Sequence, residues 1–112
     1  MDWKYKHFHQ ERLLPASRDA VVEATRRHMS EYLGWKITEA ADGLKAEGQS
    51  FTHSAIANFT IQPAGSETKI GIDLLVERAS PTGFMLFDVG GYYSIQMRKW
   101  LDGIQSGIHP TD

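Results

Sequence analysis

The chain of 112 residues contains no cysteine. Disulfide bonds, thiolate metal sites and cysteine nucleophiles are therefore excluded, and this composition is typical of a reducing compartment. No apolar run reaches the roughly eighteen residues that a transmembrane helix needs, and the first residues, Met1 to Lys6, carry no apolar segment typical of a secretory signal. We therefore expect a cytoplasmic protein without membrane insertion.

An excess of charge is also missing. Twelve Lys and Arg residues stand against fourteen Asp and Glu, which gives a net charge of −2. The basic residues are scattered apart from Arg26-Arg27 and Arg98-Lys99. A nucleic-acid-binding face needs clustered cations, so no nucleic-acid partner is predicted.

The composition is that of an ordinary globular chain, with 41% hydrophobic and 11% aromatic residues. Its length lies at the mode of the domain-size distribution and leaves no room for a second core. We expect a single α+β domain over residues 1–104 and a flexible C-terminal tail over 105–112.

Periodicity and turn residues divide the chain into strands and helices. Ser17 is placed to cap a helix and Gly34 to end it. An Asp42-Gly43 pair between two short alternating runs predicts a two-residue hairpin loop, and residues 63–67 form a longer loop of turn formers. The predicted elements are a strand at 3–14, a helix at 17–33, strands at 35–41, 44–49, 51–62 and 68–78, and a helix at 88–104.

Both long strands have one apolar face, and the last helix has an apolar stripe that can cover it. The strand faces comprise Ala55, Ala57, Phe59 and Ile61, and Ile70, Ile72, Leu74 and Val76. The stripe comprises Val89, Tyr93, Met97, Trp100 and Ile104. The order strand, helix, four strands, helix therefore predicts an α+β two-layer sandwich, in which the C-terminal helix packs on a five-stranded antiparallel sheet.

Specific segments reinforce this order: Leu14-Pro15-Ala16-Ser17 before the first helix, Phe87-Asp88 before the second, and residues 62–70 and 77–80. Together they resemble the START-like superfamily, also called SRPBCC or polyketide cyclase-like, and in particular its short bacterial members. The resemblance implies a helix-grip or TATA-binding-protein-like topology. In the larger relatives the sheet and C-terminal helix enclose a cavity for lipids, hormones or polyketides. Their cyclase activity depends on residues without a common motif, so no catalytic position is carried over.

The first functional hypothesis is therefore a module that binds a small hydrophobic ligand or lipid between the sheet and the C-terminal helix. The expected ligand-binding residues are Phe59, Ile61, Ile72, Leu74, Tyr93, Met97 and Trp100, and the expected polar partners are Tyr93, Tyr5 and His53. Core packing explains the same apolar stripe and is the base expectation. Tyr92 and Ile95 fall off the stripe and indicate either a wider cavity or a partner.

Histidines and carboxylates offer weaker candidates. His7 and His9 project on one face of a strand and, with His53, have a spacing that a metal could use, but exposed strand histidines explain them better. His28 lies in an apolar helical row and is interpreted as a packing residue. Asp73 and Glu77, about 13 Å apart along a strand, are too distant to act as a carboxylate pair. No metal, cofactor or catalytic residue is predicted.

Two other classes of function remain as alternatives. A protein-interaction domain with a filled core, or a homodimer formed through a sheet edge or the last helix, predicts an apolar patch and no cavity. An enzyme, such as a cyclase or hydrolase, needs a polar residue with a displaced pKa inside the cup, and no sequence feature singles one out. We rank the binding module first, the interaction domain second and the enzyme third.

Overall fold

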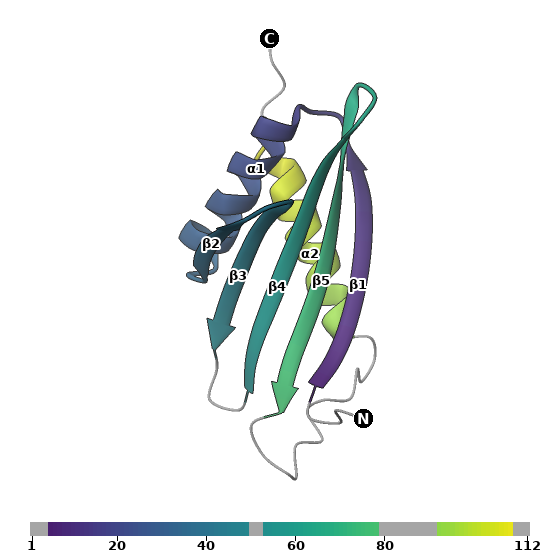
Figure 1. The fold of residues 1–112 in the computed structure, drawn as a ribbon. Helices are drawn as coiled ribbons and strands as arrows, with labels where there is room; N and C mark the ends of the chain where they lie inside the picture. Colours follow the sequence, from purple (N-terminus) through teal and green to yellow (C-terminus); the bar gives the residue numbers. More distant parts are fainter. Residues whose placement is uncertain (1–4, 50–52, 79–91, 109–112) are drawn as a thin grey trace.

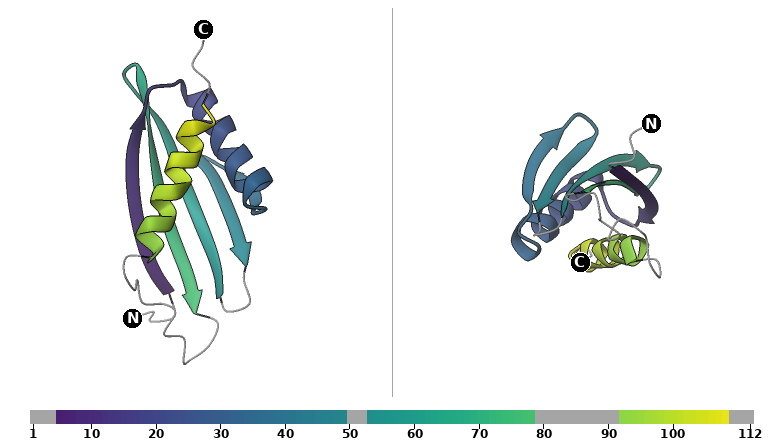
Figure 2. Two further views of the ribbon diagram at one scale, coloured as in Figure 1. Left: turned by 180° about the vertical axis from the view of Figure 1, so that it is seen from behind. Right: turned by 90° about the horizontal axis from the view of Figure 1, so that it is seen from below.

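The computed structural model describes residues 5–49, 53–78 and 92–108. Within them the sheet has the order β1-β5-β4-β3-β2, and every neighbouring pair of strands is antiparallel (Figure 1). Both helices cover the same face of the sheet (Figure 2). The predicted α+β architecture is thereby confirmed. The elements are β1 (Tyr5–Leu14), α1 (Arg18–Arg27), the π-helical turn η1 (His28–Tyr32), β2 (Lys36–Ala40), β3 (Gly43–Gln49), β4 (His53–Ala64), β5 (Glu67–Arg78) and α2 (Tyr92–Ser106).

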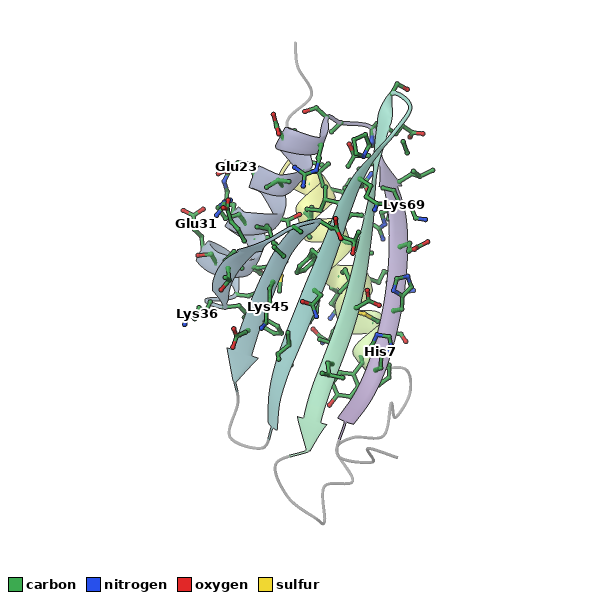
Figure 3. All side chains as sticks on the ribbon, in the orientation of Figure 1. His7, Glu23, Glu31, Lys36, Lys45 and Lys69 are labelled. Carbon is green, nitrogen blue, oxygen red and sulfur yellow. The ribbon has the colours of Figure 1, made fainter. Side chains whose placement is uncertain are left out.

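The core lies between the sheet and the two helices, on the strand faces that the alternation predicts. Phe59 and Ile61 on β4 are buried, and so are the inward residues of β5 from Ile70 to Val76. Helix α2 adds Met97, Leu101 and Ile104, since residues at these helical intervals share one face. The opposite face of the sheet carries polar side chains, among them His7, Lys45 and Lys69 (Figure 3).

Helix α1 begins as its sequence predicts and ends differently. The Ser17 hydroxyl accepts a hydrogen bond from the Ala20 backbone N–H at 3.2 Å, as an N-cap should. The final turn is not α-helical, because the Leu33 N–H donates to the carbonyl oxygen of His28, five residues earlier, at 3.1 Å. Gly34 then ends the helical segment with φ of +73°.

The first hairpin forms, but its loop is shifted by one residue from the prediction. Ala40 pairs with Gly43, so Ala41 and Asp42 make the loop and Gly43 belongs to β3. A glycine at position 43 allows β3 and β4 to approach closely, because a Cβ there would collide with the carbonyl oxygen of Phe59 on β4. The Asp42 carbonyl also accepts a bond from the Ile61 N–H at 2.8 Å.

The predicted loop at 63–67 is likewise shorter than expected. Ala64 pairs with Glu67, which leaves only Gly65 and Ser66 as the turn. Gly65 has φ of +68°, a conformation that costs glycine little. The first residue of β3, Gly43, pairs with Thr60, so the later residues of β4 have a neighbouring strand on one side only. Pro63, which has no backbone N–H to donate, is therefore tolerated there.

The predicted ends of other elements differ by a few residues. Helix α2 continues through Ser106, and Ile108 packs against the core, so residues 105–108 of the expected tail are structured. Residues 88–91 and 109–112, and the starts predicted for the strands at 3–14 and 51–62, lie outside the described residues.

Side-chain hydrogen bonds fix the helices on the sheet. The Arg18 guanidinium donates to the Ile61 carbonyl at 2.9 Å, and the Gln10 amide donates to the Ser94 carbonyl at 2.8 Å. At the edge of α2, Arg12 pairs with Asp102 at 2.8 Å. No helix in the described part of the chain combines the length and apolar character required to cross a bilayer.

Candidate functional site: two joined hollows beside helix α2

An inner pocket of about 210 Å³ lies between the sheet and α2. Its floor is the inward face of β4 and β5, and its roof is the first half of α2. Apart from one glutamine and the tyrosine hydroxyl, the lining is apolar or aromatic, which suits a hydrocarbon chain or a single ring. The lining residues are Leu33, Trp35, Ala55, Leu74, Val76, Tyr93, Gln96 and Trp100.

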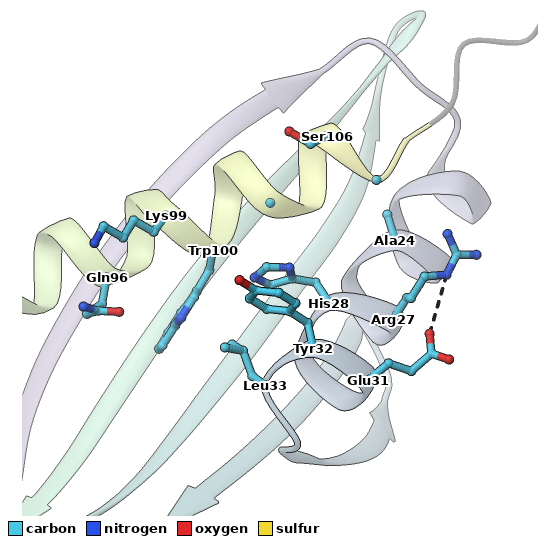
Figure 4. Close-up of a pocket in the computed structure, with 12 residues that line it drawn as sticks. Ala24, Arg27, His28, Glu31, Tyr32, Leu33, Gln96, Lys99, Trp100 and Ser106 are labelled. Carbon is cyan, nitrogen blue, oxygen red and sulfur yellow. Dashed lines mark ion pairs between the residues drawn. The ribbon is translucent and has the colours of Figure 1, made fainter.

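A larger groove of about 740 Å³ runs between α1–η1 and α2 (Figure 4). Two helical stripes face each other across it, each spaced at three or four residues. Helix α2 contributes Gln96, Lys99, Trp100, Gly103, Ser106 and Gly107. The opposite wall consists of Ala24, Arg27, His28, Glu31, Tyr32 and Leu33.

The two hollows meet at a shared wall. Leu33, Gln96 and Trp100 line both of them. The Trp100 side chain is only 8% exposed and meets the Trp35 ring edge-on, with the ring centroids 5.2 Å apart. Because Trp100 lines both hollows, a molecule that spans them must pass beside its indole.

His28 is the titratable group most enclosed by the groove. Burial lowers the pKa of its imidazole below the usual 6.5, because the charged form loses hydration, so the ring is neutral at pH 7. Its ring stacks on that of Tyr32, with centroids 5.1 Å apart. Within the described part of the chain the imidazole has no hydrogen-bond partner. The neutral ring therefore adds an aromatic surface, and no charge, to the groove.

The structure separates the sequence-predicted ligand residues into two groups. Leu74, Tyr93 and Trp100 line the inner pocket. Phe59, Ile61, Ile72 and Met97 are buried in the core, at most 2% exposed, and line neither hollow. The side chains of Tyr5, His53 and Tyr92 lie outside the described part of the structure, and Ile95 is half-buried.

The apolar pattern of the sequence did not reveal three residues of α2 that line the groove. Gln96, Lys99 and Gly103 lie beside the apolar stripe of α2, so a search for apolar periodicity passes over them. Their three- and four-residue spacing is the signal that indicates a second face on this helix. Trp35, predicted to begin a strand, packs inward instead, and Gly48 opposite gives its indole room.

His7 and His9 belong to a polar cluster on the outer face of the sheet. His7 Nε2 and His9 Nδ1 both contact the Asp73 carboxylate, at 3.1 and 2.8 Å. Hydrogen bonds to Asp73 and then to Glu11 raise the pKa of His9 above 6.5, and those from His9 and Lys69 lower the pKa of Glu11. In the described residues no group of three ligating side chains could hold a metal ion. The cluster is a surface network of hydrogen bonds that also contains the Lys69–Glu11 ion pair.

No protein-family model matches the chain, and no curated protein matches it in sequence. Solved structures do share its fold. Ara h 8.0201 aligns with a TM-score of 0.61 and 10% identity over 93% of this chain and 97% of its own. TTHA0849 from Thermus thermophilus aligns with a TM-score of 0.60 and 13% identity over 92% and 97%.

A third structure is the di-domain ARO/CYC protein BexL from the BE-7585A biosynthetic pathway. It aligns with a TM-score of 0.56 and 10% identity over 97% of this chain, which spans 52% of the BexL chain. Likeness at such low identity concerns the fold alone. The fold is thus the helix-grip fold that the sequence resemblance implies.

Proposed function

We propose that the protein binds a small apolar molecule in the inner pocket, with one end of the molecule reaching the groove beside Trp100. The observation that carries this proposal is the apolar pocket of about 210 Å³ between the sheet and α2, which shares three lining residues with a groove of about 740 Å³. Typical ligand sites measure about 300–1,000 Å³ and hold a few polar groups in an apolar lining. The inner pocket alone is smaller than this, so the groove must hold the rest of the molecule. The START-like fold, whose larger members enclose a cavity in the same place, supports the proposal.

The size of the inner pocket indicates the kind of molecule. Removing a methylene group from water contributes about 0.8 kcal/mol, which is about fourfold in affinity. A straight alkyl chain that enters the pocket should therefore bind about four times more tightly for each added carbon. This gain should stop once the pocket beside Leu74 and Val76 is full. A series of normal alcohols from butanol to decanol measures both the slope and the length at which it ends.

Ala55 is the position at which to block the pocket, because its side chain lines it from β4. In an Ala55→Leu variant the added carbons should occupy part of the volume and weaken octanol binding at least tenfold. Asn58→Leu is the matched control, since Asn58 lies on the same strand but is exposed on the outer face. Calorimetric titration of both variants tests the proposal. Equal octanol affinity in the two variants, or no binding to the wild type, would refute it.

A further inference from the structure

We propose that the natural ligand carries a carboxylate at the end opposite its apolar chain, and that Lys99 with Gln96 recognises this group at the mouth of the inner pocket. The inference rests on the proposed function, since it assigns the polar end of the molecule whose chain fills that pocket. It names Lys99 as the residue that determines specificity for the headgroup.

The position of Gln96 and Lys99 relative to the pocket is the first argument. Gln96 lies three residues before Lys99 and four before Trp100 on α2, so its side chain neighbours both of theirs on the helix surface. Figure 4 shows Gln96 and Lys99 on one side of Trp100, with His28 and Tyr32 on the other. Gln96 lines both hollows, and a group that contacts its amide therefore lies where the inner pocket opens.

The charge of the groove is the second argument. The ionised residues that line it are Arg27, Glu31 and Lys99. Arg27 lies 3.7 Å from Glu31 and 3.8 Å from Glu23, so the charges of this wall compensate one another. Lys99 forms no ion pair with any residue that the structure describes. His28 is neutral because burial lowers its pKa. One uncompensated positive charge thus remains among the residues that line the groove.

The chemistry of the two side chains selects the headgroup. An ammonium group and a primary amide both donate hydrogen bonds, and a carboxylate with two acceptor oxygens can take one from each. A headgroup that carries a positive charge would be repelled by Lys99, and Glu31, the carboxylate among the lining residues of the groove, already pairs with Arg27. Lys99 is exposed, so the preference should be modest, about two- to fivefold in affinity.

Three probes with the same chain test the headgroup directly: octanoate, octanol and octylammonium, all measured near neutral pH. The wild type should bind octanoate about two- to fivefold more tightly than octanol, and octylammonium most weakly. Raising the salt concentration should reduce the difference, because an exposed pair is screened.

Two charge-matched variants locate the effect. Lys99→Gln should remove the preference for octanoate, measured as the ratio of octanoate to octanol affinity in the same variant. Arg98→Gln removes the same charge from the neighbouring residue of α2, which is exposed and lines neither hollow, and should keep the preference. Equal thermal midpoints for both variants and the wild type show that folding is intact.

The other outcomes separate this inference from the proposed function. If octanol binds and Ala55→Leu blocks it, but octanoate binds no more tightly, the headgroup assignment is wrong and the pocket stands. If both charge variants weaken octanoate binding equally, the preference comes from the overall positive charge of this part of α2, and the assignment to Lys99 is also wrong. If none of the three probes binds, both proposals fail together.

Discussion

The imidazole of His28 packs directly onto the backbone of α2 at Gly103, and a Cβ at position 103 would overlap the ring. Figure 4 shows the His28 side chain extending from η1 toward α2. The contact brings η1 and α2 together at one end of the groove. The width of the groove beside Trp100 is therefore set by a glycine on one helix and an aromatic ring on the other.

A Gly103→Ala substitution should destabilise the protein by about 1 kcal/mol. Alanine favours the helix by about 1 kcal/mol, but displacing the packed imidazole costs about 1–3 kcal/mol. In a His28→Ala background the obstacle is gone, so the same substitution should stabilise by about 1 kcal/mol. Urea denaturation of the two single variants and the double variant measures the coupling. An identical effect of Gly103→Ala in both backgrounds would show that the two residues do not interact.

His28 should also make stability depend on pH. Its pKa is lowered in the folded state, so the unfolded chain binds more protons once the pH falls below about 6.5. Stability that is present at neutral pH should therefore be lost as the pH falls through this value. A His28→Asn variant should show a smaller loss between about pH 7 and pH 5 in urea denaturation.

His9 should change the pH dependence of stability in the direction opposite to His28, and it provides the comparison. Its pKa is raised, chiefly by the hydrogen bond to Asp73, so its stabilisation is present below about 6.5 and is lost as the pH rises through its higher folded value. A His9→Asn variant should therefore lose more stability on acidification than the wild type. The assignment is wrong if both asparagine variants follow the wild-type pH profile.

Periodicity predicted the architecture because burial acts on every second residue of a strand and every third or fourth of a helix. The inward residues from Ile70 to Val76 and the α2 stripe ending at Ile104 follow this rule directly. The same rule does not distinguish a pocket wall from a core. Ile72 and Leu74 have the same pattern, yet Leu74 lines the pocket and Ile72 does not.

The remaining features depend on how distant segments pack, which local pattern does not encode. His28 and Tyr32 stack within the π-helical turn, and nothing in their spacing distinguishes this turn from an α-helical one. The groove needs α1 and α2 at a particular separation, which a glycine at position 103 permits. Asp-Gly is a strong hairpin signal and predicts a turn residue at Gly43, whereas the role of this glycine is close contact with Phe59.

Two strand glycines should respond differently to alanine. Gly43→Ala places a Cβ against the carbonyl oxygen of Phe59 and should cost about 2 kcal/mol or more, because a backbone atom cannot move aside cheaply. At Gly71 an added Cβ would lie 3.6 Å from the nearest atom, in the His9 ring, so Gly71→Ala should be neutral or slightly stabilising. Thermal denaturation compares the two. Equal losses would contradict the close approach at Gly43.

Trp100→Ala should cost about 3 kcal/mol, at the lower end of the range for a buried tryptophan, since the indole is 8% exposed and already borders open space. The variant should also lose octanol binding, because the wall shared by the two hollows is removed. Chemical denaturation gives the first value. Wild-type stability would place the indole outside the core.

The most direct test of the central claim is a backbone NMR titration of the isotope-labelled protein with octanol. Binding in the inner pocket predicts shift changes at Leu33, Ala55, Leu74 and Val76, and none at Lys45 and Asn58 on the outer face of the sheet. Saturable changes at the first group would establish the site between the sheet and α2. Spectra that do not change, or changes confined to the outer face, would contradict it.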